Sequence, residues 1–225
     1  MGGKLTLKER FVLLALDDAQ GYIIHHNTAY WIGLAGAVLF EMLEKGLVMF
    51  DDHCINYLTP IADDPCHVRV LNLLKKHSQP PRVERVLEEM WDSIEDTQQE
   101  IINGLVNQGI LKEVKKSLLW FIPIKRYPMV NKIPELRLRK YLMVLAQEDR
   151  VPDEESFLLF RLVYQCGLVA EVFGKKNQKV ISEYIEELKE VNDASGKISE
   201  SVKNIETALL TAIRNLNLQM VLSGG

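Results

Sequence analysis

The stretch "NTAYWIGLAGAVLFEMLEKGL", residues 27–47, decides the fold of this protein. It is apolar on all sides for about two helical turns and then becomes amphipathic. Asn27 or Thr28 can cap the start of a helix, because a short polar side chain accepts a hydrogen bond from an unpartnered backbone N–H. Gly33 and Gly36 would let another backbone approach closely. We predict that this stretch forms the central buried helix.

A second helix is expected in "LTLKERFVLLALDDAQGYI", residues 5–23. Thr6 and Glu9 have the spacing of a capping box, and the apolar run after them predicts a helix that is buried on most sides. Residues 17–21 are typical of a turn in which Gly21 takes a positive φ. The run is too short to cross a membrane, which requires about 20 apolar residues.

The remaining sequence predicts more helices than strands. Short β-compatible runs lie at residues 47–52 and 55–60, on either side of a turn. Two helices should be divided at residues 79–81, because consecutive prolines end a helix. An apolar spacing of 3.6 residues predicts further helices over residues 97–111, 133–149, 153–173, 176–192 and 198–216, with a loop at 192–196.

These patterns together predict a mainly α fold class. We expect a single globular multi-helix domain over residues 1–225, with its core at about 5–217, around the buried central helix. One β-hairpin should protrude from it, formed by "LKEVKKSLLWFIPIKRYP", residues 111–128, with residues 114–116 near its turn.

The composition is that of a globular protein, with 47% hydrophobic and 26% charged residues among 225. Three cysteines without the spacing of a disulfide framework favour a reducing compartment. No signal peptide precedes the first helix, and no run of 18 apolar residues occurs. We therefore expect a cytoplasmic protein, or one bound peripherally at the cytosolic face of a membrane.

Positive charge is concentrated in one segment. The whole chain has a net charge of −4, but residues 111–140 hold nine lysines and arginines and two glutamates, a net charge of +7. A basic face on an acidic protein favours an anionic partner. A solvated charged face without a partner is the alternative.

The residues with metal-binding side chains do not form a specific motif. His53 and Cys54 cannot easily share a zinc ion with Cys66 and His67, because adjacent residues of an extended chain point to opposite faces. We expect buried cysteines and exposed histidines here. Three aspartate pairs, at 17–18, 51–52 and 63–64, could bind Mg²⁺, but each lies where a turn is expected. We predict no metal, no cofactor and no catalytic residues.

The predicted hairpin carries the clearest functional signal. Its apolar run consists of Leu118, Leu119, Trp120, Phe121 and Ile122, and Lys125 and Arg126 follow closely. Apolar side chains that enter lipid contribute about 25 cal/mol per Å² of buried surface, and each nearby base adds about 1 kcal/mol at an anionic leaflet. The hairpin would then attach reversibly to a membrane. The alternative is a strand packed on its own helices or on a second subunit.

A helix followed by a hairpin is also typical of a winged-helix domain. A recognition helix should be basic, since contacts with phosphates supply much of the affinity for DNA. Residues 92–103 contain Asp92, Glu95, Asp96 and Glu100 and neither lysine nor arginine. We therefore expect no nucleic-acid partner.

Several segments in order resemble the Golgi phosphoprotein 3 domain family. They are "LTLKERFVLLALDDAQGYI", "GLAGAVLFEMLEKGLV", "GLVNQGIL", "SLLWFIPIKRYP" and "SFLLFRLVYQCGLVAEVF", and together they cover about residues 5–217. The resemblance implies a largely α-helical fold with a hydrophobic β-hairpin. For the eukaryotic members it implies peripheral membrane proteins that bind phosphatidylinositol 4-phosphate and retain glycosyltransferases through coatomer.

The same resemblance implies that the lipid-headgroup site has lost its ligands. The tryptophan of that site falls on His26, and an arginine of the glycine-flanked motif falls on Ala35. Basic residues of the family fall on Glu95, Gln98 and Glu100. A phosphomonoester needs charge-assisted donors, and glutamate has the wrong sign. This indicates a divergent member, of the kind expected in an organism without a Golgi.

We therefore expect a peripheral, non-enzymatic adaptor with a degraded phosphatidylinositol 4-phosphate site, which contacts an anionic lipid surface through its hairpin. The protein partner is not identified by the sequence. The alternative is a protein-interaction module that forms a homo-oligomer through the hairpin. A metal-dependent enzyme is the third hypothesis.

Overall fold

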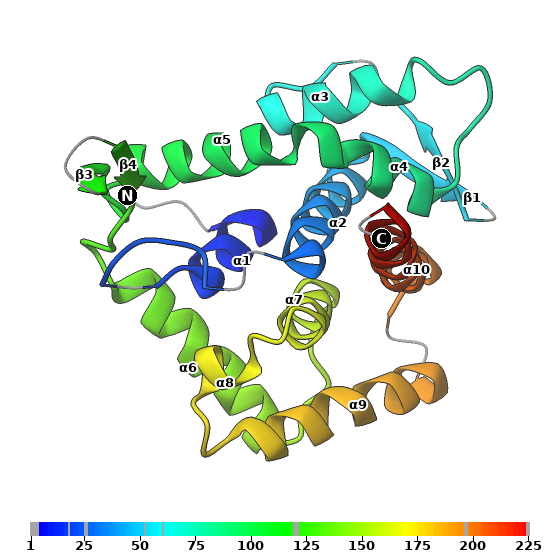
Figure 1. Ribbon diagram of the computed structural model, residues 1–225. Coiled ribbons are helices and arrows are strands. Elements are labelled where there is room, and N and C mark those ends of the chain that lie inside the picture. Colours follow the sequence, from blue (N-terminus) through cyan, green and yellow to red (C-terminus); the bar gives the residue numbers. More distant parts are fainter. Residues whose placement is uncertain are drawn as a thin grey trace.

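The computed structural model describes residues 5–17, 19–24, 27–51, 53–59, 61–118, 122–195 and 198–223. It confirms the mainly α fold class, with helices arranged around a buried central helix (Figure 1). That helix is α2, Thr28–Glu44, and Asn27 caps it by accepting a hydrogen bond from the backbone N–H of Tyr30. Figure 1 shows α2 in the middle of the molecule, and it contacts α1, α7 and α10.

The glycines of α2 make room for side chains of the helices that pack against it. A Cβ atom on Gly36 would lie 2.6 Å from Leu209 Cδ2. A Cβ atom on Gly33 would lie 3.1 Å from the ring of Phe11 and 3.2 Å from the sulfur of Cys166. The close packing of α1, α7 and α10 around α2 therefore depends on large side chains that fill the space over the glycines.

Helix α1, Leu7–Ala15, begins as the sequence predicts. The Thr6 side chain accepts from the Glu9 backbone, and the Glu9 carboxylate accepts from the Thr6 backbone, which completes the capping box. Residues 11–15 of the helix are fully buried. Gly21, in the turn after α1, has a φ of +66°, as expected.

A small hairpin precedes the next helices. Strands β1, Val48–Asp51, and β2, Cys54–Tyr57, pair antiparallel at the two predicted runs. The chain then forms α3, Pro65–Leu74, and α4, Val83–Glu89, separated at the double proline as predicted. The 3-10 helix η1, Met90–Ser93, leads directly into α5, Ile94–Asn107.

The predicted hairpin exists, but its turn lies elsewhere. Strands β3, Val114–Leu118, and β4, Ile122–Arg126, pair antiparallel, with Val114 opposite Arg126. Residues 114–116 therefore belong to β3 and not to the turn. Two lysines in succession resemble a polar turn, but in the hairpin Lys115 lies opposite Lys125. The connection between the strands, residues 119–121, lies outside the described residues.

The last third of the chain forms α6, Ile133–Gln147; α7, Glu154–Gln165; α8, Val169–Phe173; α9, Gln178–Ser195; and α10, Glu200–Ser223. The helix predicted over 153–173 is two helices, because Gly167, at φ +71°, ends α7. The loop predicted at 192–196 was wrong for residues 192–195, which continue α9. Intrinsic turn propensity is weak there against the propagation of a long amphipathic helix.

Candidate functional site

A cavity of about 380 Å³ lies at the root of the β3–β4 hairpin. The loop between α1 and α2, one face of α5 and the end of β4 line it. Its lining residues are Leu16, Gly21, Tyr22, Ile23, Gln98, Ile102, Lys125, Arg126 and Tyr127. Two predictions made on separate grounds therefore meet here: Gln98 from the headgroup site, and Lys125 and Arg126 from the hairpin.

Gly21 fixes the end of the hairpin to the rest of the molecule. The Tyr127 backbone N–H donates to the Gly21 carbonyl oxygen at 2.9 Å. A Cβ atom on Gly21 would lie 2.1 Å from the carbonyl carbon of Tyr127, so only glycine fits. The Tyr127 hydroxyl accepts a 3.0 Å hydrogen bond from the Gln99 amide of α5. These contacts place the two cations that precede Tyr127 at the cavity.

The two cations are held differently. The Arg126 guanidinium lies 5.1 Å from the centre of the Tyr22 ring, in a cation–π contact. The Lys125 ammonium lies 3.1 Å from the Glu113 carboxylate. That hydrogen bond raises the pKa of Lys125, so the side chain stays charged at neutral pH. The cavity therefore presents positive charge at the hairpin.

Gln98 reaches the cavity from α5. Its Oε1 accepts a 2.7 Å hydrogen bond from the Tyr30 hydroxyl of α2. Burial raises the pKa of Tyr30 well above its ordinary value, so the hydroxyl remains a donor across the physiological range. The Gln98 amide is a neutral group at the position where the family resemblance implies a base.

The other headgroup equivalents lie apart from this cavity. Ala35 is buried inside α2, and Glu95 is exposed on the first turn of α5. Glu100 faces α3, where it pairs with Arg69 and accepts from the Cys66 thiol at 3.3 Å. His26 lies outside the described residues. Among the described equivalents, Gln98 alone lines the cavity, and a role of these positions in lipid binding stays a prediction.

The apolar run of the hairpin is described only in part. Leu119, Trp120 and Phe121 lie outside the described residues. Leu118 and Ile122 lie opposite each other at the ends of β3 and β4, so the run spans the connection between the strands and is not one strand. Its contact with lipid stays a prediction.

Comparison with known proteins identifies the family of this chain. The family model described as Golgi phosphoprotein 3 (GPP34) matches residues 7–209. The chain belongs to this family. It is similar to the vacuolar protein sorting-associated protein 74 of Schizosaccharomyces pombe, with 22% identity over 197 residues. These cover 76% of this chain and 58% of the relative, so the chain spans less than two thirds of that protein.

Family membership confirms the resemblance read from the sequence, and the low identity shows a divergent member. Among the described residues, no helix is both long and apolar enough to pass through a bilayer. The described helices and the cavity between them are therefore those of a Golgi phosphoprotein 3 domain.

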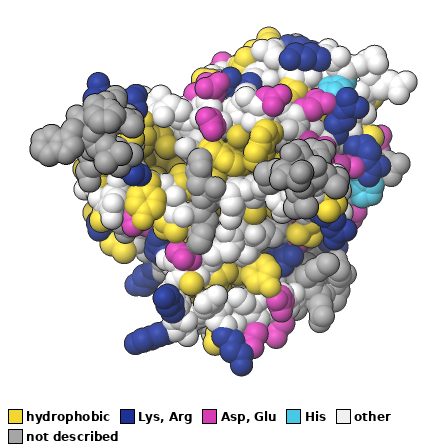
Figure 2. Space-filling model, viewed as in Figure 1, with side chains coloured by type: hydrophobic (Ala, Val, Ile, Leu, Met, Phe, Trp, Pro, Cys, Tyr) yellow, Lys and Arg dark blue, Asp and Glu magenta, His cyan; other side chains and the backbone are white. Residues whose placement is uncertain are grey.

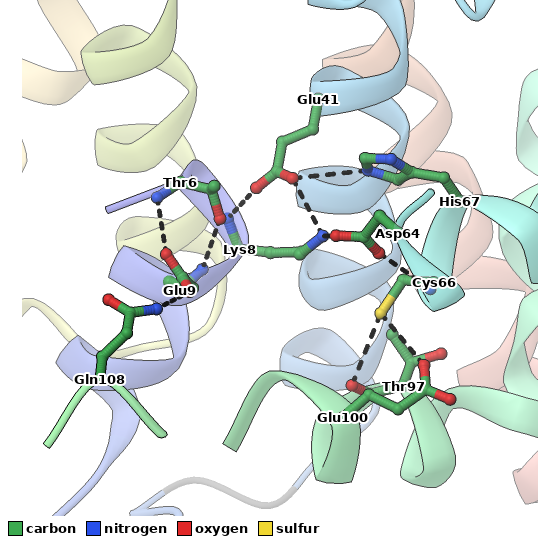
Figure 3. A network of polar contacts seen from close by, with 10 residues as sticks. All are labelled: Thr6, Lys8, Glu9, Glu41, Asp64, Cys66, His67, Thr97, Glu100 and Gln108. Atoms are coloured by element: carbon green, nitrogen blue, oxygen red, sulfur yellow. Dashed lines mark hydrogen bonds and ion pairs between the residues drawn. The ribbon is translucent and has the colours of Figure 1, made fainter. Parts of the chain in front are cut away.

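A second polar cluster lies inside this domain, and sequence reasoning missed it (Figure 3). The Lys8 ammonium lies 3.1 Å from Glu41 Oε2 and also contacts the Asp64 carboxylate. His67 Nε2 lies 3.5 Å from the same Glu41 oxygen. Lys8, Glu41 and His67 are all buried, and the cluster joins α1, α2 and the start of α3, where only the Asp64 side chain is partly exposed. The prediction of an exposed histidine was wrong for His67, because this buried carboxylate provides a partner for it.

The charges of this cluster stabilise one another. Burial acts to lower the pKa of Lys8, but the nearby Glu41 and Asp64 carboxylates outweigh it and raise that pKa. Burial acts to raise the pKa of Glu41, but His67 and Lys8 outweigh it and lower that pKa. The pKa of Asp64 is lowered as well, against its burial, by its hydrogen bond with Lys8. All three groups are therefore ionised at neutral pH.

The cluster contains side chains that could bind a metal ion, but a lysine ammonium already lies between the two carboxylates. Glu41, Asp64 and His67 offer ligand atoms within 4.8 Å of one another. The Lys8 ammonium already bridges the two carboxylates, and a cation of like charge would have to displace it. The residues present therefore fit an internal ion pair better than a metal ion. The available signal in the sequence was Glu41, a charged residue within the apolar run of α2.

A larger hollow of about 760 Å³ lies between the start of α1, α6 and the start of α7. Leu5, Ile110, Ile133, Leu138 and Tyr141 form much of its apolar wall. Its charged groups offset one another, because the lining holds two arginines, Arg10 and Arg137, and two acids, Asp153 and Glu155, with Arg10 3.1 Å from Glu155. This hollow has no net charge that would select an anion.

Proposed function

We propose that this protein is a peripheral, non-enzymatic membrane adaptor that contacts an anionic lipid surface at the cytosolic face through its β3–β4 hairpin. The observation that carries the proposal is the shared cavity at the hairpin root, where Lys125, Arg126 and Gln98 come together. The apolar run 118–122 lies at the other end of the same hairpin, since β4 begins at Ile122 and ends with the two cations. Cations beside an apolar loop match the chemistry of an anionic leaflet.

The proposed site attracts negative charge without selecting a phosphomonoester. Lys125 shares its ammonium with Glu113, and Gln98 is neutral. Glu95 on the same helix would repel a doubly charged headgroup. A bidentate cluster of arginines, which phosphate recognition favours, is not formed by the described lining residues. We therefore expect general attraction to anionic lipid and no preference for phosphatidylinositol 4-phosphate.

Vesicle flotation tests this proposal. Phosphatidylcholine vesicles with and without phosphatidylserine are compared for the wild type, Trp120→Ala/Phe121→Ala and Lys125→Glu/Arg126→Glu. Each base contributes about 1 kcal/mol near an anionic surface, so loss of both should weaken partitioning roughly thirtyfold. The matched control is Lys75→Glu/Lys76→Glu, which reverses two exposed lysines just after α3.

Equal partitioning of the wild type and the tryptophan–phenylalanine variant would end the membrane proposal. Replacing part of the phosphatidylserine by phosphatidylinositol 4-phosphate at constant total charge should leave binding unchanged. Light scattering that showed a hairpin-dependent dimer, together with no flotation, would favour the alternative function, an interaction module that dimerises through the hairpin.

A further inference from the structure

The outward face of α6 carries large apolar side chains that the rest of the protein does not cover. Val130 is 58% exposed, Ile133 56%, Leu136 58% and Tyr141 45%. The first three are spaced three residues apart, at the start of the helix and just before it. The opposite side of α6 packs into the core through Leu138, Leu142 and Leu145. Such an uncovered apolar stripe on an otherwise well-packed helix indicates a contact surface.

The charged side chains that α6 itself exposes on this face all have one sign, and Arg137 also borders the hollow that Asp153 and Glu155 line. Lys132, Arg137 and Lys140 are exposed among the apolar residues. Glu135 is the single acid between residues 130 and 147, and it is fully buried and paired with Arg139. The outward face of α6 therefore combines apolar and cationic side chains without an exposed carboxylate of its own.

This face is close to the hairpin. Ile133 is seven residues along the chain from Arg126, at the end of β4, so the two can be at most about 25 Å apart. The Lys112 N–H donates to the Pro128 carbonyl at 3.1 Å, and the Val130 N–H to the Ile110 carbonyl at 2.9 Å. These bonds hold the link against the end of α5. Figure 2 shows cationic side chains along the lower left of the molecule, over α6 and α8 and below the hairpin (Figures 1 and 2).

We propose that the outward face of α6, defined by Val130, Ile133, Leu136, Arg137, Lys140 and Tyr141, is a second contact surface for an anionic lipid bilayer. Interfacial helices have this combination, with apolar and aromatic side chains that enter the headgroup region and cations that meet anionic lipid. The inference rests on the proposed membrane function and extends it from one loop to a surface. Two contacts would also fix the orientation of the domain on the membrane, which a single hairpin cannot do.

Two double variants measure the contribution of this face to binding. Arg137→Glu/Lys140→Glu should weaken flotation with phosphatidylserine vesicles about tenfold or more, and Ile133→Ser/Leu136→Ser should weaken it as well. Because these side chains are exposed, both variants should keep the circular dichroism and melting temperature of the wild type. The matched control is Val180→Ser/Leu210→Ser, which removes two exposed apolar residues on α9 and α10.

A probe on α6 reports the contact directly. Leu136→Cys, made in a Cys54→Ser background and labelled with a polarity-sensitive fluorophore, should shift to the blue with phosphatidylserine vesicles and not with phosphatidylcholine alone. If the protein floats but the probe does not shift, the proposed contact of α6 with lipid is wrong, and the proposed function of the hairpin is retained. If the probe shifts and the hairpin variants bind normally, the hairpin function fails and the α6 surface stands.

Two further outcomes would contradict the contact of α6 with lipid. If the wild type does not float with anionic vesicles, both proposals fall. Light scattering without lipid could instead show an oligomer that Ile133→Ser/Leu136→Ser dissociates. In that case the face binds a second copy of the chain, and the proposal that it contacts a bilayer is wrong.

Discussion

The Tyr127 backbone N–H donates a 2.9 Å hydrogen bond to the Gly21 carbonyl oxygen, and this contact fixes the hairpin to the loop after α1. The two residues touch so closely that a methyl group on Gly21 would overlap the Tyr127 backbone. The position of the hairpin therefore depends on a glycine that is distant from it in the sequence.

Gly21→Ala should destabilise the protein by about 2 kcal/mol or more, because the strain of a positive φ adds to a clash with fixed backbone. Urea unfolding followed by circular dichroism measures this loss. Gly46→Ala is the matched control, since Gly46 has a φ of +63° but nothing within 4 Å of its added Cβ. The control should lose only about 1 kcal/mol. Equal losses in the two variants would contradict the close contact with Tyr127.

Lys8→Met should destabilise the domain by about 3–5 kcal/mol, because it leaves the Glu41 carboxylate buried without its cation. Adding Glu41→Leu removes the uncompensated charge, and the double variant should be more stable than Lys8→Met alone. Urea unfolding of the two single variants and the double variant gives the coupling energy. Strictly additive losses would show that the two side chains do not interact.

Stability should fall at acid pH through the same cluster. The pKa values of Glu41 and Asp64 are lowered below their ordinary 4.5 and 3.8, so their contribution is complete above about pH 5 and is lost as the pH falls through the lowered values. The pKa of Lys8 is raised above 10.5, so its contribution persists throughout neutral pH. Unfolding free energies of the wild type and Glu41→Gln should differ most at neutral pH and converge in acid. A constant difference between them would contradict the cluster.

The three cysteines should differ in reactivity. Burial raises the pKa of the Cys66 and Cys166 thiols well above their ordinary value, whereas Cys54 is only half-buried. Native protein should therefore be alkylated by iodoacetamide at Cys54 first, and all three cysteines should react in urea. Peptide mass spectrometry identifies the sites. Modification of Cys66 at the rate of Cys54 in the native state would show that α3 opens readily.

Signals carried by neighbouring residues predicted most of the fold. Thr6 with Glu9, Asn27 before an apolar run, and the prolines at 80 and 81 each act within one turn of chain, and the structure has a cap or a break at each. The errors lie where a local preference competes with neighbouring structure, as at residues 192–195, which extend α9, and at residues 114–116, which pair in β3. Polar runs favour turns, but they also occupy exposed faces of helices and hairpins.

The sequence by itself determined the helical class, the hairpin and the family, because periodicity, caps and ordered motifs are properties of short segments. Only the tertiary structure decided which polar groups meet. Lys8 lies 33 residues from Glu41 and 56 from Asp64, yet their charged groups are in contact. Gln98 and Arg126 likewise share a cavity although they lie on different elements. Such pairings follow from the packing of whole helices around α2, and no local pattern encodes them.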